Sequence, residues 1–193
     1  CFAMTETGHG SDVQSIRTTA TYEDGGFTVH TPDRSARKDY IGNAARHGRL
    51  AVVFAQLVVG GEGRGVHALL VPIRDGDGAP LPGVTIEDDG LKAGLNGVDN
   101  GRLTFDHVRV PRENLLDRYG SVSEGGEYSS PIESAGRRFF TMVGTLVRGR
   151  ISVAGGAGSA AKAALTIAVR YGDARRQFDR PGNPPEEVPV LDY

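Results

Sequence analysis

Residues 50–59 read LAVVFAQLVV, and residues 66–73 read VHALLVPI. Both runs are almost continuously apolar, and both are short enough to be single strands. Such runs are typical of strands that are buried on both faces. Glycines at positions 60, 61 and 63 interrupt the chain between them. The two runs therefore predict buried strands in a β-rich core.

Shorter strand-like runs lie on either side of this pair. Residues 16–22 (IRTTATY) and 27–30 are separated by Gly25 and Gly26, a pattern that predicts a hairpin. Residues 84–87 and 102–110 (RLTFDHVRV) read as further strands, the second with alternating polar and apolar positions. Several short strands at this spacing indicate a sandwich or a barrel.

From residue 137 onward the apolar positions recur at steps of three and four, which predicts helix. The positions that carry this period are Val143, Val147, Ile151, Ala154, Gly158, Ala161, Leu165 and Ala168. Glycine and alanine crowd the middle of the segment, although each glycine costs about 1 kcal/mol of helix stability relative to alanine. We infer that another backbone or a ligand packs closely against this helix.

These patterns predict an α+β protein. β-structure, arranged as a sandwich or a barrel, would occupy residues 1–118, and a polar connecting loop would occupy residues 119–136. Helical structure would fill residues 137–193.

The composition excludes several classes of protein. With 38% hydrophobic and 24% charged residues among 193, the chain is not a disordered polymer. No run approaches the ~18 apolar residues of a membrane span, so we expect a soluble protein with no membrane partner. Cys1 is the single cysteine, which rules out an internal disulfide framework and a multi-cysteine zinc site. The five histidines show no metal-ligand spacing, so no metal site is predicted: His9, His30, His47, His67 and His107.

Charge is unevenly distributed. Residues 131–178 carry eight Lys or Arg against two Asp or Glu, whereas the whole chain has a net charge of −2. A basic helical segment of this kind can meet an anionic ligand, or it can simply present a solvated face. The composition points to no nucleic-acid partner. Arginine and glycine are abundant and lysine is scarce, which suggests a GC-rich bacterial genome and a cytoplasmic protein.

The segment MTETGHGSDV at residues 4–13 is the strongest single motif. A strand runs into a Gly-x-Gly turn that is followed by Ser11 and Asp12. Glycines let backbone amides approach an anion, and a serine hydroxyl adds a donor. Taken alone, the pattern is also compatible with an ordinary turn.

The chain resembles the acyl-CoA oxidases of the acyl-CoA dehydrogenase superfamily over essentially its whole length. Residues 1–13 (CFAMTETGHGSDV) resemble the flavin-binding strand of these enzymes, and residues 38–44 (KDYIGNA) resemble the KxWITNA segment. Further similar segments follow in the family's order: 55–57, 65–68, 71–74, 81–84, 98–101, 109–114, 142–151 (MVGTLVRGRI), 175–178 (RRQF) and 189–193 (PVLDY).

This resemblance implies an antiparallel β-barrel domain over residues 1–118 and the long helices of a partial helical bundle over residues 137–193. It also implies FAD-dependent oxidation of a fatty acyl-CoA to trans-2-enoyl-CoA in fatty acid β-oxidation. Dioxygen would accept the electrons and give hydrogen peroxide. One alternative is an acyl-CoA dehydrogenase that uses an electron-transfer flavoprotein, although the GHG and VPIR segments and Gly42 favour the oxidase. An alternative of another class is a non-catalytic β-barrel binding module. A peroxisomal location is implied if the source is a eukaryote.

The resemblance also assigns roles to individual residues. Thr5 would contact the pyrimidine edge of the flavin, and Gly10 and Ser11 the FAD pyrophosphate. Tyr40 replaces the tryptophan that usually packs on the flavin, and Gly42 replaces a threonine whose hydroxyl meets flavin N5. Each of these residues also has a plain structural interpretation, such as a core side chain for Tyr40 and a bulge for Gly42.

The helical segment contributes the remaining assignments. Arg175 and Phe178 would contact the FAD of a neighbouring subunit, which implies a homodimer. Arg148 and Arg150 are assigned to the substrate. The resemblance places the catalytic glutamate after residue 193, so no catalytic residue is assigned here and the chain by itself is expected to be an inactive fragment.

Overall fold

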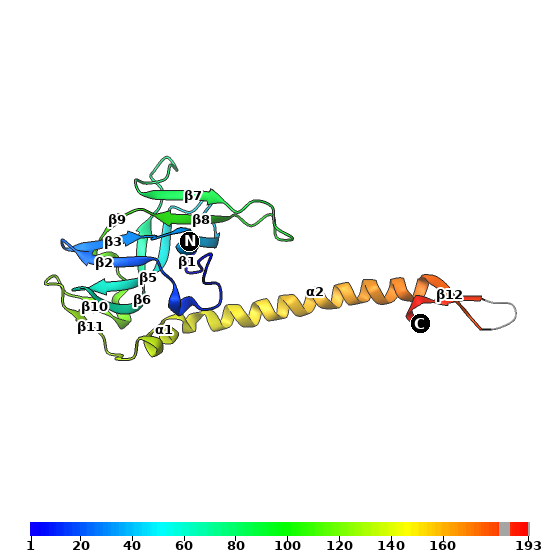
Figure 1. Ribbon diagram of the computed structural model, residues 1–193. Helices are drawn as coiled ribbons and strands as arrows, with labels where there is room; N and C mark the ends of the chain where they lie inside the picture. Colours follow the sequence, from blue (N-terminus) through cyan, green and yellow to red (C-terminus); the bar gives the residue numbers. More distant parts are fainter. Residues whose placement is uncertain (182–185, 193) are drawn as a thin grey trace. The chain divides into compact units, whose positions relative to one another are not determined.

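The computed structural model describes residues 1–181 and 186–192. These residues form two compact units, Cys1–Met142 and Val143–Tyr193. The first unit contains the strands of a curled sheet, and the second contains a long helix and a small hairpin (Figure 1). Residue 193, the last of the PVLDY motif, lies outside the described residues, as do residues 182–185.

A six-stranded sheet forms the larger part of the first unit. Its strands run in the order β1-β5-β2-β3-β9, and β6 pairs with the other edge of β5. Their bounds are Phe2–Ala3 (β1), Thr19–Glu23 (β2), Gly26–His30 (β3), Leu50–Val59 (β5), Glu62–Pro72 (β6) and Val108–Pro111 (β9). The LAVVFAQLVV run is thus the central strand β5, as its apolar character predicts.

The strand pairings confirm the predicted fold class and refine it. β2 and β3 form the predicted antiparallel hairpin, and β5 and β6 form a second one. β1 and β2, however, both pair with β5 in parallel, so the sheet is mixed. The length of β5 allows this, because β1 pairs near its start and β2 pairs further along.

A second sheet of three strands belongs to the same unit. Its order is β4 (Lys38–Gly42), β8 (Asn100–Phe105) and β7 (Val84–Asp88). Alternate residues of β8 are buried, as expected for a strand with one face on the core. The core includes the fully buried side chains Phe27, Leu57, Leu69, Ile73, Leu103 and Phe105.

The prediction of one strand over residues 102–110 was wrong. The chain leaves β8 after Phe105 and enters β9 at Val108, and these two strands belong to different sheets. The turn is made at Asp106 and His107, and His107 has a left-handed backbone with φ 50°. Alternating polarity alone cannot show such a corner, because both strands keep the same period.

Short elements surround the sheets. Four 3₁₀ helices span Val13–Ser15, Arg34–Ala36, Arg112–Asn114 and Asp117–Tyr119, and β10 (Ser121–Val122) pairs with β11 (Tyr128–Ser129). The helix α1 (Ala135–Val143) buries Arg138 and Phe139. The Arg138 guanidinium donates hydrogen bonds to the backbone carbonyls of Arg64 and Ile132, which ties this helix to β6.

The second unit begins with a 3₁₀ turn, Gly144–Leu146, and continues into the 28-residue helix α2 (Val147–Ala174). The hairpin of β12 (Arg176–Arg180) and β13 (Glu186–Pro189) follows, and the 3₁₀ turn Val190–Asp192 comes after it. In place of the several long helices expected, the described residues of this unit contain one long helix. The sequence predicted that another backbone or a ligand packs closely against the glycines of this helix. Among the described residues, no atom outside the helix's own backbone lies within 4 Å of the position that a Cβ would take at residues 149, 155, 156 and 158.

Among the described residues, one helical stretch, Ala135–Ala174, is long and apolar enough to cross a membrane by length and composition, with a mean hydropathy of 1.2 in its most apolar window. The expectation of no such segment rested on continuous apolar runs, and this stretch reaches its hydropathy without one. A single helix of this kind is weak grounds for a membrane span. A helix with small and apolar residues on all sides also suits close packing against other helices.

A buried histidine gives the first unit a predictable response to acid. His67 on β6 contacts the Gly65 carbonyl through Nδ1 and the Tyr128 hydroxyl through Nε2, both at 3.0 Å. Burial lowers the pKa of His67 to about 4, and the nearby charge of Arg138 acts in the same direction. Because the pKa of an unfolded histidine is about 6.5, the unfolded chain takes up the proton first.

We therefore expect the contribution of His67 to stability to be complete above pH 6.5 and to be lost as the pH falls toward 4. Urea unfolding at pH 7 and at pH 4.5 measures the effect. Between these two pH values the free energy of unfolding should fall more for the wild type than for His67→Gln. His47→Gln, at an exposed position, is the control and should lose as much as the wild type. Equal losses in wild type and His67→Gln would contradict the prediction.

Candidate functional site

The N-terminal motif lies directly against β4. The Thr5 carbonyl accepts a hydrogen bond from the Asp39 amide at 3.0 Å, and the Thr7 amide donates to the Arg37 carbonyl at 2.9 Å. The Gly8 amide likewise donates to Ser35 at 2.8 Å. The fold thus brings the TETGHG and KDYIGNA segments together, although they are separated by a complete hairpin in sequence.

A buried ion pair anchors this contact. The Lys38 ammonium donates to the Glu6 carboxylate at 2.9 Å and to the backbone carbonyls of Met4 and Phe54 at 3.2 and 2.7 Å. Both side chains are 0% exposed. The Glu6 carboxylate also accepts hydrogen bonds from the amides of Arg17 and Thr18. Both charges are therefore satisfied, and four chain segments are joined at one point.

The strand β4 is irregular at Tyr40, the residue that the sequence resemblance assigns to packing on the flavin. Its pairing with β8 shifts register between Lys38 and Ile41, which marks a bulge. Tyr40 has φ 60°, a left-handed conformation that is uncommon for a bulky residue. Its side chain is 68% exposed, whereas Ile41 is buried. Tyr40 is therefore not a core residue, and its ring is presented on the surface.

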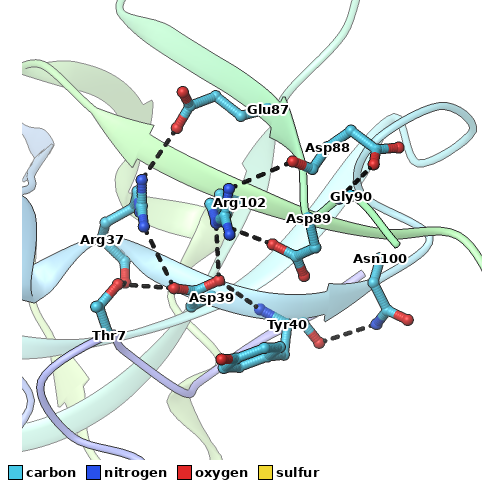
Figure 2. A network of polar contacts seen from close by, with 10 residues as sticks. All are labelled: Thr7, Arg37, Asp39, Tyr40, Glu87, Asp88, Asp89, Gly90, Asn100 and Arg102. Carbon is cyan, nitrogen blue, oxygen red and sulfur yellow. Dashed lines mark hydrogen bonds and ion pairs between the residues drawn. The ribbon is translucent and has the colours of Figure 1, made fainter. Parts of the chain in front are cut away.

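Polar side chains hold Tyr40 in this conformation (Figure 2). Asp39 Oδ1 accepts a hydrogen bond from the Tyr40 amide at 3.1 Å, and Asn100 Nδ2 donates to the Tyr40 carbonyl at 3.1 Å. Both backbone groups of Tyr40 are thus held by side chains, one from the same strand and one from β8. Backbone strain persists where the surroundings fix it in this way, and such places are often functional.

The Asp39 carboxylate is the centre of this network. It accepts from the Thr7 hydroxyl at 2.8 Å and from Arg102 Nε at 3.1 Å, and it lies 3.4 Å from Arg37. Thr7 belongs to the N-terminal motif, so the same carboxylate contacts both segments of the site.

A second buried carboxylate shares Arg102. Asp89 Oδ1 lies 3.0 Å from Arg102 Nε, and its side chain is 3% exposed. Burial raises the pKa of Asp89, and the neighbouring Asp39 raises it further. Burial acts in the same direction on Asp39, but the hydrogen bonds from Thr7 and Arg102 outweigh it and leave the pKa of Asp39 below its usual value. Asp39 is thus the more acidic member of the pair.

The other predicted residues of the first unit are accessible. Gly42 follows the bulge, and no atom lies within 4 Å of the position that a Cβ would take there. The same is true of Gly10, and Ser11 beside it is exposed. Thr5 is partly buried. The structure thus brings Thr5, in the segment after β1, beside the strand β4 that carries Tyr40 and Gly42, and it leaves Gly10 and Ser11 in the loop that follows Thr5.

The remaining predicted residues belong to the second unit. Arg148 and Arg150 lie in the first turns of α2, and both are exposed. Arg175 follows the last turn of the helix, and its carbonyl accepts from the Val190 amide at 2.8 Å. Phe178 has φ 67° at a bulge between Gln177 and Asp179, and its side chain is 53% exposed.

Sequence reasoning missed the residues that support the site. They are Glu6, Lys38, Asp39, Asn100 and Arg102. Glu6 and Lys38 lie inside the two motifs quoted from the sequence. Their pairing could not be predicted, because the two charged side chains meet only through the sheet and their spacing in sequence does not indicate it.

Comparisons with known proteins give a consistent result. Residues 1–108 match the family described as acyl-CoA dehydrogenase, middle domain, and residues 143–193 match acyl-CoA oxidase, C-alpha1 domain. Peroxisomal acyl-coenzyme A oxidase 3 of Arabidopsis thaliana is 48% identical over 195 residues, a match that covers 100% of this chain. The chain spans only 29% of that relative's length.

Solved structures are similar as well. An acyl-CoA oxidase from tomato aligns with a TM-score of 0.82 and 39% identity, covering 100% of this chain and 30% of the tomato chain. Acyl-CoA oxidase-2 of Caenorhabditis elegans, bound with FAD, ascaroside-CoA and ATP, aligns with a TM-score of 0.76 and 38% identity. That match covers 100% of this chain and 29% of the other.

Proposed function

This chain belongs to the acyl-CoA dehydrogenase and oxidase family, and on that premise we propose that it is the flavin- and substrate-contacting part of an acyl-CoA oxidase. The observation that supports this most is the bulge in β4, which holds Tyr40 exposed beside the TETGHG segment. The reaction proposed is oxidation of a fatty acyl-CoA to the trans-2-enoyl-CoA, with dioxygen as the acceptor and hydrogen peroxide as the second product.

The residues of the first unit fit FAD. Tyr40 offers an exposed aromatic ring, the positions beside Gly42 and Gly10 are open, and Ser11 offers an exposed hydroxyl. When bound, FAD supplies the electron acceptor for oxidation of the Cα–Cβ bond of the thioester. We propose that Thr5 binds the pyrimidine edge of the flavin, that Tyr40 packs on the ring system, and that Gly10 and Ser11 bind the pyrophosphate.

The second unit has a separate proposed role. Arg175 and Phe178 would contact the FAD of a neighbouring subunit in a homodimer, and Arg148 and Arg150 would contact the acyl-CoA. The apolar side chains exposed along α2 support packing against further helices, because Val153, Ile151 and Ile167 are each about 70% exposed. We propose the division into a barrel domain (1–118), a connecting loop (119–136) and the start of a helical domain (137–193).

Two alternatives remain distinguishable by experiment. An acyl-CoA dehydrogenase would pass its electrons to a flavoprotein, and a binding module would hold no flavin. The location is proposed as peroxisomal for a eukaryotic source, in line with the name of the Arabidopsis relative, and cytoplasmic for a bacterial source.

The test uses the full-length protein that carries this chain. Its absorbance at flavin wavelengths is recorded, and hydrogen peroxide is measured during turnover of a fatty acyl-CoA in air. Peroxide formed in step with substrate consumption supports the oxidase. Turnover that requires an electron-transferring flavoprotein supports the dehydrogenase, and a colourless protein supports the binding module.

Gly42→Thr tests oxygen access in that protein. The open space at this position and the strand backbone both accept a β-branched side chain, so we expect the variant to fold. Its hydroxyl would hydrogen-bond the flavin and narrow the approach of dioxygen. We expect re-oxidation of the flavin by dioxygen to slow by about tenfold. This factor corresponds to the free energy of one hydrogen bond near the upper end of the usual range. Reduction of the flavin by acyl-CoA should change little.

Stopped flow measures the two half-reactions separately. Gly63→Thr, at another open glycine in β6, is the matched control and should affect neither. If both half-reactions of Gly42→Thr fall equally, the substitution acts on the site as a whole and the oxygen-access prediction is wrong.

Arg175→Ala tests the contact with FAD. The guanidinium is exposed at the end of α2, so its removal leaves no buried partner unsatisfied. A charge-assisted contact of ~1.5–3 kcal/mol corresponds to at least about a tenfold loss of FAD affinity. Equilibrium dialysis of full-length Arg175→Ala and of the neighbouring control Arg176→Ala checks this. If Arg175→Ala binds FAD as tightly as the wild type, Arg175 is only a solvated cation and does not contact FAD.

A further inference from the structure

Two histidines and an aspartate meet where β3 ends. His30 is the last residue of β3, and Asp106 and His107 form the corner between β8 and β9. In the antiparallel β3–β9 ladder Val29 pairs with Val108, so the next positions outward are His30 and His107. The two rings stack, with centroids 4.0 Å apart and an angle of 27° between their planes.

Backbone hydrogen bonds fix this corner. The Thr31 amide donates to the Phe105 carbonyl at 2.7 Å, and the Phe105 amide donates to the Thr31 hydroxyl at 3.0 Å. The Asp106 amide donates to the Gly83 carbonyl at 2.7 Å. Thr31, next to His30, and Phe105, next to Asp106, are therefore tied to each other, and the three side chains are held near one another.

The ligand atoms of the cluster are close and only partly satisfied. Asp106 Oδ1 lies 2.7 Å from His107 Nδ1 and 3.7 Å from His30 Nδ1. All three potential ligand atoms lie within 4.8 Å of one another. Among the described residues, His30 Nδ1 is a buried atom with no hydrogen-bond partner. A buried polar atom without a partner calls for an explanation, and a bound ion is one.

We propose that His30, Asp106 and His107 bind a divalent transition-metal ion of the zinc class. Two imidazole nitrogens and one carboxylate oxygen are a donor set that Zn²⁺, Co²⁺ and Ni²⁺ accept, whereas Mg²⁺ and Ca²⁺ prefer oxygen ligands alone. Asp106 and His107 are exposed, so water can complete the coordination. Small side-chain rotations would bring the three atoms to ~2.0–2.2 Å from one ion.

Histidine spacing in the sequence could not indicate this site. His30 and His107 are far apart along the chain and become neighbours only through the β3–β9 pairing. The proposal is independent of the flavin chemistry, because none of its residues takes part in the Tyr40 network.

The test is a titration of the chain with Zn²⁺ alone by calorimetry, repeated with Co²⁺ by visible absorption. We perform it in a Cys1→Ser background, because the free thiol is itself a zinc ligand. One equivalent of Zn²⁺ should bind. His107→Asn should weaken binding by at least ~10-fold, since even the loss of a residue that supports a ligand costs 10–100-fold. Asparagine tolerates the left-handed backbone at this position, so the variant should fold.

His30→Asn is a second variant that should show the same loss. The matched control is His47→Asn, because His47 Nδ1 also lies near a carboxylate, 3.3 Å from Asp99, but has no second histidine beside it. Its affinity should equal that of the starting protein. Absence of stoichiometric Zn²⁺ binding, or unchanged binding in both His107→Asn and His30→Asn, would overturn the proposal.

Discussion

Replacing Lys38 with methionine is expected to destabilise the chain by about 3–5 kcal/mol, the usual cost of removing one partner of a buried ion pair. The Glu6 carboxylate would remain 0% exposed with its counter-ion gone, and the carbonyls of Met4 and Phe54 would lose their donor. Methionine fills a similar volume, so a cavity is not the cause. Urea unfolding at pH 7 measures the effect.

Two further variants separate charge pairing from packing. The double variant Lys38→Met with Glu6→Gln removes both charges and should recover part of the loss, because no unpaired charge stays buried. Lys162→Met in α2 is the control at an exposed lysine and should change stability by less than about 0.5 kcal/mol. A cost for Lys38→Met as small as that of the control would show that the pair is not an anchor.

The same lysine predicts an alkaline trend. Burial lowers the pKa of Lys38 to about 8, against the opposing charge of Glu6, whereas an unfolded lysine titrates near 10.4. Between these values the unfolded chain binds more protons than the folded chain. The contribution of Lys38 to stability therefore rises as the pH increases from about 8 to about 10.4, and Lys38→Met should abolish this rise.

Replacing Asp39 with alanine is expected to lower the free energy of unfolding by about 1–3 kcal/mol. We expect the same substitution to weaken flavin binding as well. The Thr7 hydroxyl, Arg102 and the Tyr40 amide would lose their shared acceptor. This cost is smaller than the cost of replacing Lys38. Arg37 still lies beside Glu87, and Arg102 still lies beside Asp89. With its amide released, Tyr40 is expected to leave the left-handed conformation that presents its ring.

The readout for Asp39→Ala is the FAD affinity of the full-length protein together with its unfolding midpoint. Asp39→Asn keeps an acceptor for the Tyr40 amide and should retain more flavin than Asp39→Ala. Asp77→Ala, at an exposed turn position, should match the wild type in both measurements. An unfolding midpoint that falls while FAD affinity stays constant would show that the network supports the fold and not the flavin site.

Local sequence determined the elements whose signal is short-range. The apolar run LAVVFAQLVV predicted β5 to the residue, and Gly25 and Gly26 predicted the hairpin of β2 and β3. The period of three and four predicted the helical segment, since helical neighbours are close in sequence. The motifs also named Tyr40 and Gly42 as site candidates before any contact was known.

Tertiary structure alone decided which segments meet. The parallel pairing of β1 and β2 with β5, the corner at Asp106 and His107, and the cross-strand histidine pair all join residues distant in sequence. The burial of Lys38 against Glu6 and the exposure of Tyr40 depend on the same pairings. A residue type fixes its own preference for burial, but a buried charge or an exposed, left-handed tyrosine is stable only when partners from other strands satisfy it. Such partners are set by sheet register, and no local pattern in this sequence encodes them.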